Sequence, residues 1–320
     1  MTDAIFPEHA ELVGDLLSLY SKDQLPHAVL VTSVSGVGLS NAAMRLCATL
    51  LCQRSSDEAC GDCSSCSRVS AGTHGDYRWV KVAEGKASIG VDQIREASDF
   101  IAKTAGYGSQ KILVISEAEV MTTGASNALL KTLEEPQGNS LILLLSQRGW
   151  LLPATIRSRC QTWRLPALEA STSTNYLQNA GVAIPSDIKA NPRALERLVL
   201  SFSEGKVESR SVVSGMVNAM LSSEATLTEA TAALQRFELI ESVESVVLAL
   251  EERLIDDQHT SVSLGTLLQL HRAVASLLQR MRNGAVPAKE STCYEIVSLI
   301  SKARRNDIAS IEHSLQVLGA

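Results

Sequence analysis

The sequence has few aromatic residues, no long apolar run and no excess of basic side chains. Its apolar stretches, such as Leu141–Leu145, are far shorter than the roughly 20 residues that a membrane-spanning helix needs. The start, Met1–Phe6, carries an acid and no basic cluster, which disfavours a secretory leader. We therefore expect a cytoplasmic protein with no membrane partner.

Basic residues are outnumbered by acidic ones, with 29 Lys and Arg against 35 Asp and Glu and a net charge of -6 at pH 7. Proteins that wrap nucleic acid neutralise its phosphates with a basic surface. The acidic balance therefore argues against wholesale wrapping of nucleic acid, although a local DNA contact stays open. A chain of 320 residues is long enough for a sizeable core and for two or three domains.

Cysteine is also scarce, but four of the seven cysteines lie within fifteen residues: Cys52, Cys60, Cys63 and Cys66. Two overlapping Cys-x-x-Cys pairs and one upstream thiol can wrap a single tetrahedral Zn²⁺. The alternatives are a redox pair or a disulfide knot; redox chemistry needs only two thiols, and nothing indicates secretion. Because protein fills all four positions, we expect a structural zinc that folds a local module and performs no catalysis.

Strand and helix signals alternate over the first half of the chain. We expect strands at 28–32, 79–82, 111–115 and 141–145, and helices at 9–20, 41–51, 91–104 and 125–135. This alternation predicts a parallel sheet covered by helices on both faces. Beyond Pro166 only helical periodicity remains. The expected domains are an α/β module at 1–166 with the cysteine module at 52–66, a small helical domain at 167–206, and an all-helical domain at 207–320.

A glycine-rich turn follows the first strand and runs from Ser33 to Ser40. The order of strand, glycine turn and helix is the setting of a phosphate-binding loop with the pattern Gly-x-x-x-x-Gly-Lys-Ser/Thr. Gly38 and Ser40 fit this pattern and Gly36 adds a flexible position, but Ser33 replaces the first glycine and Leu39 replaces the lysine. The lysine neutralises the transferring phosphates, which leucine cannot do.

The second half of an ATPase site is an acid that holds Mg²⁺ at the end of the next central strand. Near Ile115 the sequence has Ser116, followed by Glu117. The site has thus lost two charged groups, the lysine and the metal-binding acid. This predicts an ATPase fold that does not hydrolyse ATP and holds no ATP. Weak anion binding by the backbone amides of the turn stays open, as does an ordinary glycine turn with no nucleotide history.

The segment Ser126–Pro136 reads SNALLKTLEEP, and it is followed by a strand and then by Ser158-Arg159-Cys160. These motifs closely resemble the clamp-loader subunits of bacterial DNA polymerase III, and the cysteine module with the missing lysine is similar to the delta-prime type. The resemblance covers about residues 1–200 at the level of motifs. It implies an AAA+ module, a helical lid and a helical collar in a five-subunit ring. The implied partners are ATPase gamma/tau-type and delta-type subunits, with the sliding clamp and primed DNA reached through the complex.

The resemblance also implies a role for Arg159. In that family the arginine of the Ser-Arg-Cys motif reaches across the interface to the ATP of the neighbouring subunit, and a planar, permanently charged guanidinium suits a transferring phosphoryl group. Arg157 is the weaker candidate, and a solvated basic pair is the plain alternative for both. Arg193, in the expected lid, lies where active AAA+ proteins carry a nucleotide-sensing arginine; without nucleotide a structural role is the alternative, and the sequence leaves the two open.

The sequence thus predicts a non-hydrolysing stator subunit of a clamp loader, part of a DNA polymerase holoenzyme but not itself an active ATPase. One alternative is an ATP-hydrolysing motor subunit, which Leu39 and Ser116 disfavour. The other is a zinc-dependent nucleic-acid binding protein. The acidic balance and the lack of interleaved aromatic and basic residues around the cysteines disfavour that alternative.

Overall fold

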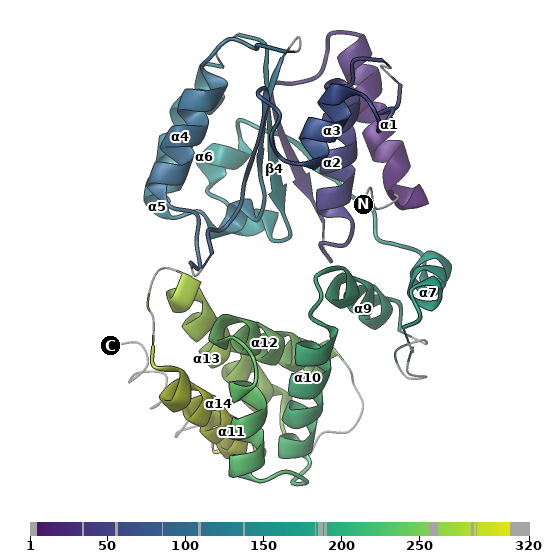
Figure 1. The fold of residues 1–320 in the computed structure, drawn as a ribbon. Coiled ribbons are helices and arrows are strands. Elements are labelled where there is room, and N and C mark those ends of the chain that lie inside the picture. The colour runs from purple at the N-terminus through teal and green to yellow at the C-terminus, as the bar shows by residue number, and fades with distance from the viewer. Residues whose placement is uncertain are drawn as a thin grey trace. The chain divides into compact units, whose positions relative to one another are not determined.

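The computed structural model divides into two compact units, residues 1–200 and 201–320 (Figure 1). It describes residues 5–33, 35–54, 57–84, 86–107, 110–136, 138–182, 184, 188, 191–255, 262–282, 285 and 287–307. Within these residues the first unit contains every strand, and the second contains helices alone. No helix of the described residues combines the length and the apolar character needed to cross a membrane.

The first unit is built on one five-stranded parallel sheet. Its strands are β1 (Ala28–Thr32), β2 (Tyr77–Val80), β3 (Lys111–Ile115), β4 (Ser140–Ser146) and β5 (Gln161–Arg164), in the order β2-β3-β4-β1-β5. All neighbouring strands pair in parallel. Every residue of β3 and β4 is buried, as expected of central strands that are covered on both faces. The predicted parallel sheet is confirmed.

Alternate residues of the strands face two separate hydrophobic layers, because side chains of a strand point to opposite faces in turn. The helices that pack on the sheet are α1 (Pro7–Ser21), α2 (Leu39–Leu50), α3 (Ser64–Ser70), α4 (Val91–Ile101), α5 (Thr123–Glu134) and α6 (Ala154–Arg157). Val29 and Val31 pack with α1, α2 and α3, while Ala28 and Leu30 pack with α4, α5 and α6. Figure 1 shows these two groups of helices on opposite sides of the sheet.

The first unit also contains two 3₁₀ turns, η1 (Ala118–Val120) after β3 and η2 (Gly149–Leu151) after β4. The helices α7 (Ala170–Asn179) and α9 (Pro192–Ser203) lead from the sheet to the second unit. The helix α9 begins with Pro192 in its first turn, and the side chain of Asn191 accepts the amide hydrogens of Arg193 and Ala194. This is a normal N-terminal cap, because the first amides of a helix have no partner within the helix.

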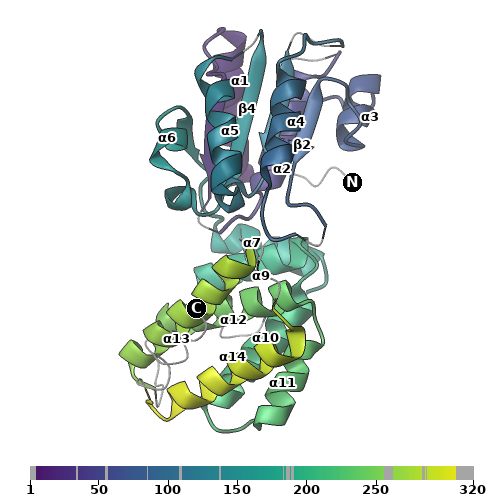
Figure 2. The same ribbon diagram turned by 90° about the vertical axis from the view of Figure 1, so that its left-hand side faces the viewer.

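The second unit is a helical bundle. Its helices are α10 (Val207–Leu221), α11 (Leu227–Gln235), α12 (Leu239–Ile255), α13 (Leu264–Arg282) and α14 (Lys289–Arg304), which lie against one another in Figures 1 and 2. One apolar core joins all five, and it includes Val243, Val247 and Leu250 of α12 and Leu270 and Val274 of α13. The predicted helical C-terminal region is confirmed.

Candidate functional sites

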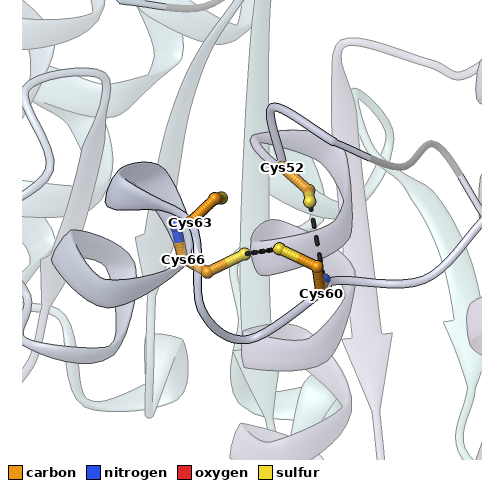
Figure 3. Close-up of side chains that lie close together, drawn as sticks. All are labelled: Cys52, Cys60, Cys63 and Cys66. Carbon is orange, nitrogen blue, oxygen red and sulfur yellow. Dashed lines mark hydrogen bonds between the residues drawn. The ribbon is translucent and has the colours of Figure 1, made fainter.

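Four sulfur atoms converge beside α2 and α3 (Figure 3). Cys52 follows α2, Cys60 lies in the next loop, Cys63 caps α3, and Cys66 lies within α3. Their Sγ atoms all lie within 4.8 Å of one another, and those of Cys60 and Cys66 are 4.0 Å apart. Sulfurs about 2.3 Å from a central zinc in a tetrahedron are about 3.8 Å from each other. The cysteines are free thiols and all four predicted ligands are brought together, so the cluster fits one tetrahedral metal ion.

The local fold already favours the thiolate form at part of this cluster. Cys63 Sγ accepts the amide hydrogen of Cys66 at 3.4 Å, and this bond is the largest of several hydrogen bonds that together outweigh burial and lower the pKa of Cys63 to about 6. Burial has the opposite effect on Cys66 and raises its pKa to about 12. A divalent cation offsets that penalty, because a thiol that coordinates a metal is deprotonated. The four donors therefore have the chemistry of a metal site whose folding and metal binding are coupled.

A buried polar network ties this module to the sheet. Ser65, beside Cys66, donates from Oγ to the carbonyl oxygen of Leu51 at 2.5 Å. The amide hydrogen of Asp76 donates to His74 Nδ1 at 3.0 Å, so His74 Nε2 carries the proton and donates to Ser65 Oγ at 2.9 Å. His74 thus holds the turn that leads into β2.

The glycine-rich turn is closed by its own side chains. The amide hydrogen of Gly36 donates to Ser33 Oγ at 3.1 Å, and that of Val37 donates to Ser35 Oγ at 3.3 Å. A phosphate-binding loop directs such amides at its anion. Gly36 and Gly38 have φ angles of 79° and 69°, the left-handed region that glycine adopts without strain. The backbone therefore turns like a phosphate loop, but serine hydroxyls occupy two of its donors.

Side chains from outside the turn fill the adjacent space. A Cβ at Gly38 would overlap the imidazole of His9, and one at Gly36 would overlap the side chain of Gln147. Leu39, which replaces the lysine of an ATPase, is the first residue of α2 and is 6% exposed in the core of the unit. A side chain buried in that core cannot contact a bound phosphate.

Ser116, which replaces the metal-binding acid, is engaged in the fold. Its Oγ accepts the indole hydrogen of Trp79 at 3.0 Å and donates to the carbonyl oxygen of Val80 at 3.2 Å. Glu119 brings a carboxylate to the same edge of the sheet, a residue that the sequence did not single out. Its Oε1 accepts the amide hydrogen of Gln147 at 3.2 Å, which fixes the end of β4.

Arg159 lies at the opposite edge of the sheet from the glycine turn. It follows α6 and precedes β5, whose Gln161 pairs with Val29 near the start of β1. The turn follows Thr32 at the end of β1. Parallel strands keep the same direction, so the two features are separated along the strands by at least about 10 Å. Arg159 therefore cannot serve the glycine turn of its own chain.

The Arg159 guanidinium is held by a carboxylate oxygen of Glu134 and by the backbone carbonyl oxygen of Thr155. Its Nη2 lies 2.5 Å from Glu134 Oε1 and its Nη1 donates to the carbonyl oxygen of Thr155 at 2.7 Å. The side chain is 34% exposed. Arg157, at the end of α6, is exposed, and its side chain makes no hydrogen bond or ion pair within the described part of the chain. Arg193 is exposed in the first turn of α9.

Comparison with known proteins places these features in one matching segment. The family model described as "DNA polymerase III, delta subunit" matches residues 8–169, which include the turn, the four cysteines and Arg159. The DNA polymerase III subunit delta' of Pseudomonas aeruginosa is 39% identical over 163 residues, 51% of this chain and 50% of that protein. That of Haemophilus influenzae is 34% identical over 176 residues, 55% of this chain and 54% of that protein.

The chain spans about half the length of the curated relatives it matches. Among solved structures, a DNA polymerase III gamma subunit-related protein of Thermotoga maritima covers 90% of this chain and 99% of its own, at 16% identity and a TM-score of 0.44.

Proposed function

Because the chain belongs to the delta-prime subunit family of DNA polymerase III, we propose that it is the non-hydrolysing stator subunit of a clamp loader. In this proposal it joins gamma/tau-type and delta-type subunits in a five-subunit ring. The ring loads the sliding clamp onto primed DNA. The chain binds no ATP of its own and supplies Arg159 to the ATP site of a neighbouring subunit.

The closed glycine turn carries the proposal. Phosphoryl transfer needs a cation at the phosphates and an acid at Mg²⁺. Here Leu39 is packed in the core, and Ser116 bonds to the neighbouring strand. The amides of Gly36 and Val37 are bonded to serine hydroxyls. Hydrolysis by this chain would need all of these groups to rearrange, which favours the stator over the motor subunit.

The place of Arg159 supports a role in trans. Its guanidinium is partly exposed and lies at the edge of the sheet away from the glycine turn. An arginine supplied across an interface can raise phosphoryl-transfer rates by about 10³ to 10⁵ fold, because it neutralises charge that develops in the transition state.

We also propose that Cys52, Cys60, Cys63 and Cys66 hold one structural Zn²⁺. The support is the convergence of four sulfurs within 4.8 Å and the softness of thiolate ligands, which suits zinc. Four protein ligands leave no coordination position for a substrate. The metal therefore stabilises the segment between α2 and β2 and takes no part in ATP turnover.

The test is the steady-state ATPase of a loader reconstituted with wild-type chain, Arg159→Ala or the matched control Arg157→Ala. Arg159→Ala should abolish DNA-stimulated turnover at the one ATP site that this subunit abuts, and affect the other sites only through coupling. Arg157→Ala should resemble wild type, because its side chain has no partner among the described residues. Unchanged turnover with Arg159→Ala at matched incorporation would show that the arginine is ordinary surface charge.

A second measurement tests the chain alone. Calorimetric titration of the purified subunit with Mg·ATP should show no binding in the micromolar range. Micromolar binding would mean that the glycine turn opens to admit nucleotide, and it would favour the motor-subunit alternative.

A further inference from the structure

We propose that Glu134 is the positioning residue of Arg159. Its carboxylate, together with the carbonyl oxygen of Thr155, orients the guanidinium for a phosphate of the neighbouring subunit. This inference rests on the proposed role of Arg159 in trans. It gives a function to one of two adjacent glutamates that the sequence indicates only as the end of a helix.

The contacts come from two different helices and reach two different nitrogens. Glu134 is the last residue of α5, and its Oε1 meets Nη2 of Arg159 at 2.5 Å. Thr155 belongs to α6, and its carbonyl oxygen accepts from Nη1 at 2.7 Å. Because the guanidinium is planar, fixing both terminal nitrogens fixes the plane of the whole group.

Both anchor points are rigid. Leu133, next to Glu134, is 2% exposed, and Ile156, next to Thr155, is fully buried in the same hydrophobic layer. The end of α5 is held further by His27, whose Nε2 donates to the carbonyl oxygen of Leu133 at 2.9 Å. The oxygens that orient Arg159 therefore do not depend on a mobile loop.

The ion pair leaves donors free for a ligand. A guanidinium has five N–H groups. The contacts with Glu134 and Thr155 use one on each terminal nitrogen, and Nη1 also donates to Ser158 Oγ at 3.5 Å. Among the described residues the Nε hydrogen and the second Nη2 hydrogen have no acceptor, so they stay available for phosphate oxygens. Arg159 can thus be held by its own chain and bind a neighbour's phosphate at the same time.

The solvent exposure of the ion pair indicates that Glu134 orients Arg159 and does not withhold it from a ligand. The side chains of Arg159 and Glu134 are 34% and 49% exposed. An ion pair in that range shifts an equilibrium by no more than about fivefold, which is too little to withhold the arginine from a bound nucleotide. It is enough to select one rotamer of a flexible side chain.

The experiment is a double-mutant cycle in the reconstituted loader, with kcat and KM for ATP measured for wild type, Glu134→Ala, Arg159→Ala and the double variant. Glu134→Ala should lower kcat by about twofold to fivefold and leave KM and incorporation unchanged, because the contact between a correctly oriented Arg159 and the neighbour's phosphate acts in the transition state. In the Arg159→Ala background the same change should have no further effect. Glu134→Gln should retain part of the activity, because its amide oxygen still accepts from the guanidinium.

Glu135→Ala is the matched control, because Glu135 is adjacent, exposed and without an ion pair among the described residues. It should match wild type. An unchanged kcat for Glu134→Ala beside a lowered kcat for Arg159→Ala overturns the positioning role alone. A raised kcat for Glu134→Ala also overturns it, because Glu134 would then restrain the arginine. Equal losses in both backgrounds show that Glu134 acts elsewhere. No effect of Arg159→Ala refutes the proposed function itself.

Discussion

One apolar side chain, Leu39, fills the position at which an ATPase carries its lysine. Leu39 is buried in the hydrophobic layer that contains α1, α2 and α3, so its position is fixed by core packing. Arg159, by contrast, is held only by polar contacts at the surface. The fold thus buries Leu39 in the interior and leaves the Arg159 side chain accessible to a partner subunit. Substitutions at the two positions should have different consequences.

At position 39 we expect Leu39→Lys to lower stability without creating ATP binding. A lysine there must leave the core or lose its charge, which costs about 1–3 kcal/mol of unfolding free energy. The amides of Gly36 and Val37 remain bonded to serines, and Ser116 supplies no acid. Urea unfolding and calorimetric titration with Mg·ATP measure the two effects. Micromolar ATP binding by this variant would show that the turn lacks only its lysine.

At position 159 we expect Arg159→Lys to restore little of the ATP turnover that Arg159→Ala loses. A lysine keeps the charge but offers one ammonium in place of a planar fork, so it cannot hold Glu134, Thr155 and a phosphate together. ATP turnover at the one site that this subunit abuts should stay more than about tenfold below wild type with this variant. Wild-type turnover at matched incorporation would show that a point charge is sufficient.

At the scale of elements, the strands that could be predicted are the apolar ones. Val29–Val31 and Leu141–Leu145 lie in continuous buried runs, which periodicity detects. β5 has no such signal, because its residues are mostly exposed and its place is set by pairing with β1. β2 starts at Tyr77, two residues before the predicted start, where an aromatic ring enters the core.

The two candidate sites differ in the same way. The cysteine ligands are close in sequence, so spacing alone predicted their convergence, although α3 inside the module was not predicted. The polar sequence of α3 shows no apolar stripe, and the helix starts from the Cys63 cap. The contact between Glu134 and Arg159 joins residues on different elements. Only the packing of α5 against α6 brings them together, which no local pattern reports.

For the cysteine module we expect one zinc per chain, lost in Cys63→Ser. The variant should loosen α3 and its flanking loops and leave the sheet folded, because the strands pack mainly on other side chains. Elemental analysis and amide hydrogen exchange measure the two effects. Cys160→Ser, which alters a cysteine outside the cluster, is the control and should keep its metal. Wild-type protein without zinc, purified without chelators, would contradict the site.

In the helical unit we expect Glu244→Gln to destabilise the bundle in a pH-dependent way. Glu244 pairs with Arg282 at 2.7 Å and Lys206 at 3.4 Å. Burial raises its pKa, but the two cations outweigh burial and hold the pKa below the ordinary 4.5. The lowered pKa means that its stabilisation is complete above pH 4.5 and is lost as pH falls through the lowered value.

The expected cost of Glu244→Gln at pH 7 is about 1–3 kcal/mol, because Arg282 and Lys206 both lose the charge of Glu244, and Lys206 keeps only its longer pair with Glu204. This difference from wild type should shrink steadily below pH 4.5. Urea unfolding at neutral and acidic pH gives the comparison, with Glu238→Gln as a control without an ion pair among the described residues. A difference that does not change with pH would show that packing, and not charge, accounts for the loss.

At the scale of the whole molecule, net charge separates the stator from a nucleic-acid binding protein. With 29 basic and 35 acidic residues, the isolated chain has little electrostatic attraction for phosphate backbones. We expect fluorescence anisotropy to show no submicromolar binding of primed DNA by the chain alone, and tight, salt-dependent binding by the reconstituted loader. Cys63→Ser should not change the result for the isolated chain. Submicromolar binding that disappears in Cys63→Ser would instead identify the cysteine module as a zinc-dependent DNA contact, because only that outcome links affinity to the metal.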